Sequence, residues 1–265
     1  MMRPIELYVV PPSPPCRAVI IAARYMNINI QLIQMDLMKG LVSGEQREDW
    51  FVKMNPQHCL PTINDNGFIL WESRAIMSYL ANRYAPNNPI YPKNPKRRGV
   101  VDRLMQFDLN VLYRSFGDYL IPMVRENKMV SATKPLMNNF KERKVIQALS
   151  YLDSVLASQR FVADEHLTLA DFSIFCSLEF AENFHYSFET YSNIIRYYRQ
   201  LKSIFNEFNI MPFNLCQSFD YSTRSPTISM EAIENQSRSS KRMVSDTNDE
   251  TCLISCLSKI DKLFV

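Results

Sequence analysis

The sequence lacks three features that would each point to a particular class of protein. It has no run of about 18 apolar residues, so we expect no membrane-spanning segment. Its 30 Lys and Arg residues nearly balance 27 Asp and Glu residues, and a net charge of +3 is too small to indicate binding to nucleic acid or a membrane surface. The N-terminus, MMRPIELYVV, is too short and too strand-like for a signal peptide.

The cysteines follow no spacing typical of a disulfide framework or a zinc site. Two of them lie four residues apart near the C-terminus, which suits one face of a helix as well as a metal site. Since no histidine lies nearby, metal ligation is the weaker interpretation, and we expect no metal and a reduced, cytoplasmic protein. The six positions are Cys16, Cys59, Cys176, Cys216, Cys252 and Cys256.

What the sequence does contain is a distinctive stretch at residues 55–75, NPQHCLPTINDNGFILWESRA. Asn66 and Gly67 lie between two apolar segments, which is a strong hairpin signal because a tight primed turn needs positive φ. After the hairpin, Ser73 is predicted to be the N-cap of a helix over 74–84, in which apolar side chains recur every four residues. The stretch therefore predicts a hairpin followed directly by a helix.

This stretch offers two kinds of binding group close together. An X-Pro bond is the only peptide bond that adopts cis at modest cost. A cis bond between Leu60 and Pro61 would turn the Leu60 backbone outward as an unpaired edge, on which an extended peptide could dock. The N-terminus of the following helix offers free N–H groups and a partial positive charge, which suit a carboxylate.

The first 86 residues alternate between strand and helix patterns. A polar segment at 39–48 predicts a loop before the stretch described above. The resulting order, β-α-β-α-β-β-α, fits a thioredoxin-like α/β domain over residues 1–86. The elements predicted before the hairpin are strands at 5–10 and 28–35, a helix at 17–26 and a helical turn at 50–54.

Beyond this domain the pattern is helical. Prolines bracket a linker at 87–94, and residues 95–212 carry apolar side chains at helical spacing, which predicts an all-α domain. Thr168, followed three residues later by Asp171, predicts a capped helix start with a structural role. Residues 213–265 are rich in Ser, Thr, Asn and Arg and are predicted to form a disordered tail.

Ser13 begins the sequence Ser13-Pro14-Pro15-Cys16, at the place where thioredoxin-like redox proteins begin a Cys-x-x-Cys motif. A serine there removes the attacking thiol and excludes dithiol exchange. Its hydroxyl can instead donate a hydrogen bond to a thiolate, which lowers the pKa of that thiol. A decrease of two pKa units is worth about 2.7 kcal/mol, within reach of one charged hydrogen bond plus a helix dipole.

Two other interpretations of this loop stay open. Ser13 could simply cap the helix that follows it. Cys16 is a rival nucleophile of the kind that thiol-transfer proteins use, although its place inside the helix start favours a packing role.

The motif NPQH-x-x-P-T followed by W-E-S-R-A-I resembles the delta/epsilon type of glutathione transferase found in arthropods, and the likeness extends over residues 5–208. It implies a thioredoxin-like glutathione-binding domain followed by an all-helical substrate domain. It implies a cytoplasmic detoxification enzyme in which the thiolate of glutathione, held by the Ser13 hydroxyl, attacks small hydrophobic electrophiles. Glutathione would act as co-substrate, without a metal, and the protein would be a homodimer.

The resemblance also implies which residues bind glutathione. His58 would bind the glycine carboxylate, and the Leu60 backbone would pair with the cysteinyl part. Gln46 stands where a second histidine often lies in such proteins, after a loop longer than theirs. The γ-glutamyl amine and carboxylate would be bound at the start of the following helix, where a solvated charge is the alternative for the arginine. The expected set is Gln46, His58, Leu60, Pro61, Glu72, Ser73 and Arg74.

For the hydrophobic substrate, the resemblance implies a wall of side chains from one helix of the second domain. Such an aromatic stripe is often core instead, and Tyr113 is the preferred pocket residue. The expected wall is Leu109, Tyr113, Phe116 and Tyr119.

Gln106 stands where relatives often carry an aromatic residue that stacks across a dimer, which weakens the expectation of a homodimer. A protein that binds glutathione or a hydrophobic ligand without turnover is the main alternative to an enzyme. A third interpretation is an interaction module that recruits a partner through residues 213–265.

Overall fold

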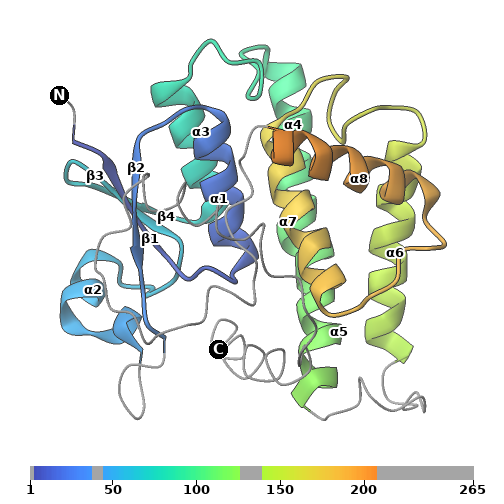
Figure 1. Ribbon diagram of the computed structural model, residues 1–265, viewed down its shortest axis with the longest axis horizontal. Coiled ribbons are helices and arrows are strands. Elements are labelled where there is room, and N and C mark those ends of the chain that lie inside the picture. Colours follow the sequence, from blue (N-terminus) through green and yellow to red (C-terminus); the bar gives the residue numbers. More distant parts are fainter. Residues whose placement is uncertain (1–2, 38–43, 126–138, 208–265) are drawn as a thin grey trace, which may run out of the picture.

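The computed structural model describes residues 3–37, 44–125 and 139–207, apart from the side chains of 123–125, 139 and 207. These residues form a small α/β unit and a larger all-helical unit that lie side by side (Figure 1). The predicted tail at 213–265, with three of the six cysteines, lies outside the described residues. The predicted fold, a thioredoxin-like domain followed by helices, is confirmed.

A four-stranded mixed sheet forms the first unit, in the order β2-β1-β3-β4. β1 pairs in parallel with β2 and antiparallel with β3, which pairs antiparallel with β4. Helices α1 and α3 lie between the sheet and the second unit, whereas α2 lies on the far side (Figure 1). The strands are β1 (Ile5–Val9), β2 (Ile30–Gln34), β3 (Thr62–Asp65) and β4 (Phe68–Trp71), and the helices are α1 (Pro14–Tyr25), α2 (Asp49–Met54) and α3 (Ser73–Tyr84).

The predicted hairpin is present. Asn66 and Gly67 have φ values of 52° and 97°, as a primed turn requires, and Asp65 faces Phe68 across the turn. The Gly67 amide donates to the side-chain oxygen of Asn64 at 2.8 Å. Local sequence chemistry therefore fixes the register of β3 and β4.

Two predicted helix starts need correction. Helix α1 begins at Pro14 rather than residue 17, because proline is tolerated in the first turn, where the missing N–H would have no helical partner. Helix α3 begins at Ser73, and its N-cap is Glu72, with φ of 72°, not Ser73. The apolar periodicity located the helix, but it did not mark the residue at which the chain turns.

The second unit consists of helices joined to a short π-helical segment at Asp108–Tyr113. That segment continues α4 directly into α5, so the helical backbone is unbroken from Pro95 to Arg125. The helices are α4 (Pro95–Phe107), α5 (Arg114–Arg125), α6 (Asn139–Leu156), α7 (Leu169–Asn183) and α8 (Ser192–Glu207).

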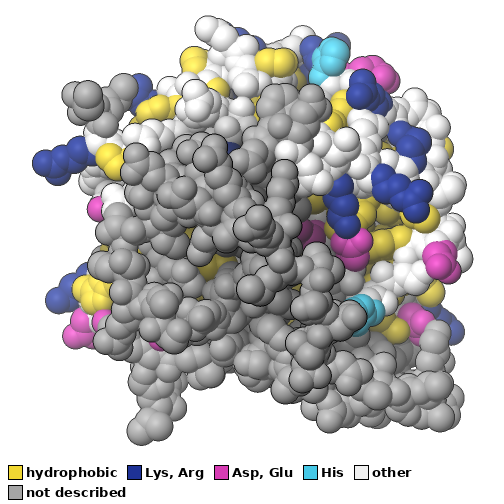
Figure 2. All heavy atoms as spheres, in the orientation of Figure 1, with side chains coloured by type: hydrophobic (Ala, Val, Ile, Leu, Met, Phe, Trp, Pro, Cys, Tyr) yellow, Lys and Arg dark blue, Asp and Glu magenta, His cyan; other side chains and the backbone are white. Residues whose placement is uncertain are grey.

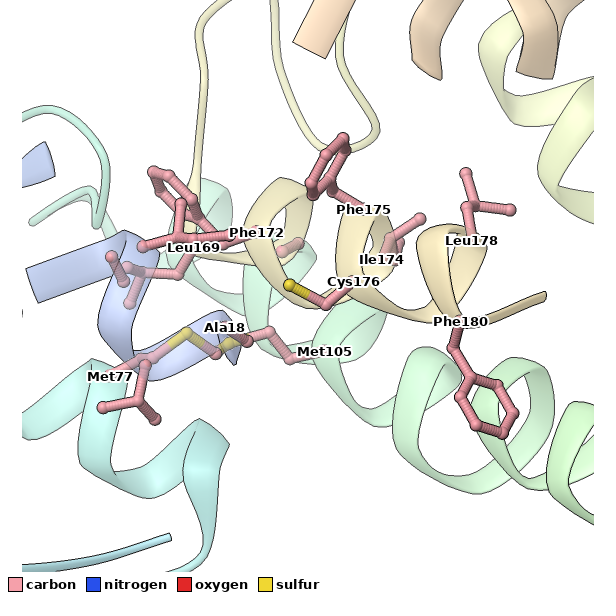
Figure 3. Packing of buried hydrophobic residues seen from close by; sticks show 14 of the residues in the cluster. Ala18, Met77, Met105, Leu169, Phe172, Ile174, Phe175, Cys176, Leu178 and Phe180 are labelled. Atoms are coloured by element: carbon pink, nitrogen blue, oxygen red, sulfur yellow. The ribbon is translucent and has the colours of Figure 1, made fainter. Parts of the chain in front are cut away.

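Helix α7 is the centre of the core, since every residue from Leu169 to Ala181 is buried. Figure 3 shows Ala18 of α1, Met77 of α3 and Met105 of α4 meeting the side of α7 that carries Cys176. The start of α7 matches its predicted capping box: one Asp171 oxygen accepts from the Thr168 amide at 2.7 Å and the Thr168 hydroxyl at 2.9 Å. One helix therefore joins the two units through a shared apolar core.

The described surface carries charges of both signs. On the face shown in Figure 2, Lys and Arg side chains lie among Asp and Glu side chains, in keeping with the small net charge. Among the described helices, none combines the length and apolar character needed to cross a bilayer. Within the same residues, no group of three His, Cys, Asp or Glu side chains is placed to hold a metal ion.

Candidate functional site

Ser13 is the N-cap residue of α1, at the end of the helix that carries the positive partial charge. Its backbone amide donates to the Val10 carbonyl at 3.1 Å, and its carbonyl accepts from the Arg17 amide at 3.0 Å. The side chain makes no capping hydrogen bond, so the alternative role as a side-chain cap is not what the structure shows. The residue is only 3% exposed.

Cys16 lies one turn into α1 and is fully buried. Burial raises the pKa of its thiol to about 12, although a hydrogen bond from the Ser13 side chain acts in the opposite direction. Cys16 is therefore a neutral thiol at physiological pH and a poor nucleophile, which agrees with a packing role. The same contact shows that the Ser13 hydroxyl lies within hydrogen-bonding reach of a sulfur atom.

The loop before β3 is held by Asn55, which is fully buried. Its side-chain amide donates to the Cys59 carbonyl at 3.0 Å and to the Thr62 hydroxyl at 2.9 Å. The peptide bond between Leu60 and Pro61 is cis. The pairing of β3 with β1 begins only at Thr62, so Leu60 precedes the ladder.

The side chains predicted to meet the two ends of a tripeptide differ in exposure. His58 and Glu72 are exposed, and both have positive φ, at 43° and 72°. Ser73 is buried at the start of α3, and Leu60 is half-buried. A carboxylate side chain and a helix N-terminus are thus adjacent, which suits a ligand group with a neighbouring ammonium and carboxylate.

Arg74 is buried, so the alternative of a solvated helix charge does not hold. Its guanidinium forms an ion pair with Asp108, which is fully buried in the π-helical segment, and donates to the Ser73 hydroxyl at 3.1 Å. The other Asp108 oxygen accepts from the Ser177 hydroxyl of α7 at 2.6 Å. This network ties the start of α3 to two helices of the second unit, and Arg74 Nε has no partner in it.

The predicted hydrophobic wall separates into two kinds of residue. Phe116 and Tyr119 are buried and meet the Tyr186 ring edge-on, with ring centroids 5.9 and 6.3 Å away, so they belong to the core behind any wall. Leu109 and Tyr113 are only half-buried. Of the four, these two remain accessible.

Phe180 was not anticipated from the sequence. Its ring lies 5.9 Å from that of Tyr113 in an edge-on arrangement. Figure 3 shows it projecting from the end of α7 toward the neighbouring helical segment. Phe180 is itself only 4% exposed, so it packs behind Tyr113 as part of the core, as Phe116 and Tyr119 do.

Gln46 lies in a single turn of 3-10 helix at Glu45–Arg47 and is buried. Its side-chain oxygen accepts no hydrogen bond. A Cβ atom on Gly44 would lie 2.3 Å from that oxygen and 2.5 Å from the Leu37 backbone, so glycine is required there. Part of the preceding loop, residues 38–43, lies outside the described residues.

A second buried ion pair joins the two units near Ser13. Arg17 Nε and Nη2 donate to the two carboxylate oxygens of Glu179 at 2.9 and 2.6 Å, linking α1 to α7. Arg17 is adjacent to the Cys16 that the sequence motif contains, but its partner lies 162 residues further along the chain. No local pattern could have paired these residues.

Comparison with known proteins assigns this chain to one family. The family models of the glutathione S-transferase N-terminal and C-terminal domains match residues 7–88 and 118–209. Glutathione S-transferase D7 of Anopheles gambiae is 33% identical over 201 residues, which are 76% of this chain and 87% of that protein. The chain therefore belongs to the glutathione S-transferase family.

Solved structures refine this assignment. A glutathione transferase of Bombyx mori, BmGSTD1, is 38% identical with a TM-score of 0.70, covering 78% of this chain and 91% of that one. A delta-class enzyme of Nilaparvata lugens is 39% identical with a TM-score of 0.68, covering 77% and 92%. Glutathione transferase E6 of Drosophila melanogaster is 28% identical with a TM-score of 0.66, covering 77% and 90%. The chain is a transferase of the delta/epsilon type.

Proposed function

We propose that this transferase conjugates the thiolate of glutathione to small hydrophobic electrophiles, and that the Ser13 hydroxyl stabilises the thiolate. The observation that carries the proposal is the position of Ser13: an N-cap at the positive end of α1, with its hydroxyl in reach of a sulfur atom. In the complex, the hydroxyl would turn from Cys16 to the glutathione sulfur by rotation about its Cα–Cβ bond.

Glutathione would lie from the start of α3 to the loop before β3. Glu72 would bind the γ-glutamyl ammonium, and Ser73 with the free N–H groups of α3 would bind its carboxylate. The Leu60 backbone, which precedes the β3 ladder, would pair with the cysteinyl residue, next to Pro61. His58 would bind the glycine carboxylate.

Gln46 and Arg74 would complete the site in different ways. Arg74 would hold Ser73 in place through their hydrogen bond and leave its unpaired Nε toward the ligand. The oxygen and nitrogen of the Gln46 side-chain amide have the same shape, so the amide can be turned over. It would then donate its N–H to the glycine carboxylate. Both roles would give a partner to a buried polar group that has none.

The electrophile would lie against Leu109 and Tyr113, with Phe180 buried behind the Tyr113 ring. The thiolate would attack an electrophilic carbon, a carbon–sulfur bond would form, and the leaving group would depart with its electron pair. The enzyme would form no covalent intermediate, because glutathione itself is the nucleophile. A role in detoxification would follow from such a substrate range.

We further propose that the protein is a homodimer. Val100 of α4, Val111 of the π-helical segment and Tyr151 of α6 are exposed. Exposed large apolar residues on neighbouring helices are typical of an interface. Sedimentation at micromolar concentration should give about twice the chain mass of 31.0 kDa, and a single-chain mass would contradict the proposal.

The test of the proposed function is a conjugation assay with a generic aromatic electrophile. We expect Ser13→Ala to lower kcat/KM by up to about a hundredfold at pH below 6, where the thiol is mostly protonated in both proteins, because two pKa units of thiol activation correspond to that factor. Ser154→Ala is the matched control, since this hydroxyl bonds only to the Tyr151 carbonyl of its own helix. Equal activity of Ser13→Ala and the wild type would refute the role of Ser13, and retention of glutathione without conjugation would favour a binding protein.

A further inference from the structure

The hydrogen bond between Trp71 and Gln57 joins the two stretches that carry the predicted glutathione contacts. The Trp71 indole N–H donates to the side-chain oxygen of Gln57 at 2.7 Å, across 14 residues of sequence. Trp71 is the last residue of β4 and directly precedes Glu72, whereas Gln57 directly precedes His58. The bond therefore links the residue beside one end of the proposed site to the residue beside the other end.

This bond completes a closed ring of contacts. Trp71 pairs with Thr62 across the β3–β4 hairpin, and the Thr62 hydroxyl accepts from the Asn55 side chain at 2.9 Å. The Asn55 side-chain oxygen in turn accepts from the Gln57 amide at 3.0 Å. The chain between two members of this ring, residues 58–61, carries three of the predicted glutathione contacts.

The two ends of the site differ in how firmly the backbone holds them. Glu72 has positive φ but is held on both sides, since β4 ends directly before it and its carbonyl accepts from the Ile76 amide at 2.9 Å in α3. His58 lies outside any strand or helix, is exposed, and has φ of 43°, in a region that is uncommon for residues other than glycine. The end that carries His58 therefore depends more on side-chain contacts.

The residues after His58 are anchored separately. Burial raises the pKa of the Cys59 thiol, and hydrogen bonds from the Asn55 side chain and the Glu72 backbone act in the opposite direction. The Asn55 side chain also donates to the Cys59 carbonyl at 3.0 Å. Loss of the bond to Trp71 would therefore loosen chiefly the turn that carries His58.

We propose that the Trp71–Gln57 hydrogen bond positions His58 for the glycine carboxylate, and so favours the tripeptide glutathione over shorter γ-glutamyl thiols. The inference rests on the proposed function, in which His58 binds that carboxylate and Glu72 binds the γ-glutamyl ammonium. A turn that is held in its binding conformation before the ligand arrives costs less to order on binding. A ligand without glycine gains nothing from this order, because it does not reach His58.

The size of the effect follows from the strength of one exposed hydrogen bond. Such a bond shifts a conformational equilibrium by about threefold to tenfold, and the apparent Kd rises by the factor by which the binding-competent population falls. Trp71→Phe removes the donor and keeps an aromatic ring, and Gln57→Met removes the acceptor from a side chain of similar length. We expect each to raise the Kd for glutathione by about threefold to tenfold, and the Kd for γ-glutamylcysteine by less than about twofold.

The test is a double-mutant cycle on the full-length protein. Titration calorimetry gives the Kd for glutathione and for γ-glutamylcysteine in the wild type, Trp71→Phe, Gln57→Met and the double variant, with unfolding temperatures measured in parallel. Gln57 is exposed, so its variant remains informative should Trp71→Phe not fold. Trp50→Phe is the matched control, because Trp50 is the second of the two tryptophans and its indole N–H likewise donates to a side chain, that of Glu48, at 2.9 Å.

The expected result is weaker glutathione binding in each single variant, no further weakening in the double variant, and no change in Trp50→Phe. Additive effects of the two substitutions would show that the side chains act independently, and they overturn the inference. Equal weakening of glutathione and γ-glutamylcysteine overturns it too, because that pattern indicates a general loosening of the site. A wild type that does not bind glutathione would refute the proposed function itself, whereas binding that none of these variants changes refutes only this inference.

Discussion

The buried network around Asp108 provides the sharpest prediction about stability. The Asp108 carboxylate is fully buried and receives the Arg74 guanidinium on one oxygen and the Ser177 hydroxyl on the other. Asp108→Ala removes both acceptors at once. Arg74 would then be left as an uncompensated positive charge between α3 and the second unit, with its Nε already lacking a partner.

The magnitude follows from what is left behind. Removing one partner of a buried ion pair costs about 3–5 kcal/mol, because the remaining charge has neither a counter-ion nor water. The unpaired Ser177 hydroxyl adds about 1–3 kcal/mol. Because whole-protein stabilities are about 5–15 kcal/mol, this one substitution should remove a large fraction of the free energy of unfolding.

The assay is equilibrium unfolding in urea, with Asp164→Ala as the control. The Arg97–Asp164 pair joins the same types of side chain, but the Arg97 side chain is 51% exposed. An exposed pair contributes about 0–1 kcal/mol. If Asp108→Ala costs no more than Asp164→Ala, the network does not hold the units together. We also expect Asp108→Ala to raise the KM for glutathione, because the network orients Ser73.

Three more predictions concern the site and the core. Gln46→His should lower the KM for glutathione several-fold at pH 6 but not at pH 8, since only a protonated imidazole adds a positive charge for the glycine carboxylate. A ratio of variant KM to wild-type KM that does not change with pH would count against that contact. Phe180→Ala removes the ring behind Tyr113, so it should raise the KM for an aromatic electrophile about tenfold and leave the KM for glutathione nearly unchanged. Equal effects on both KM values would show that Phe180 does not support the wall. Burial raises the pKa of Asp171 from its ordinary 3.8 to about 6, although hydrogen-bond donors act in the opposite direction. The folded protein therefore binds this proton more readily than the unfolded chain does, so the group stabilises the fold increasingly as the pH falls from above 6 to below 4. The difference in free energy of unfolding between wild type and Asp171→Asn should therefore change by on the order of 3 kcal/mol across that range, and a constant difference would be inconsistent with the raised pKa.

The elements that local chemistry determines were predictable from the sequence. The Asn66-Gly67 turn needs positive φ at both residues, and the Thr168–Asp171 box needs only residues three positions apart. Each feature depends on side chains within one turn of the chain. Strands and helices also follow from local patterns of apolar side chains, so their order could be predicted as well.

The charged links between the units could not be predicted in this way. Arg74 pairs with a residue 34 positions away and Arg17 with one 162 positions away, so their partners depend on how α7 packs. Phe180 supports the Tyr113 ring for the same reason. The site residues of the first unit could be proposed from a motif, whereas the contribution of α7 became visible only in the packed structure.

The most direct test of the central claim is the ionisation of glutathione bound to the wild-type protein and to Ser13→Ala. The account predicts a thiol pKa near 6.5 in the wild type and a return to about 8.5, the value of a free thiol, in the variant. Equal thiol pKa values in the two complexes would contradict it.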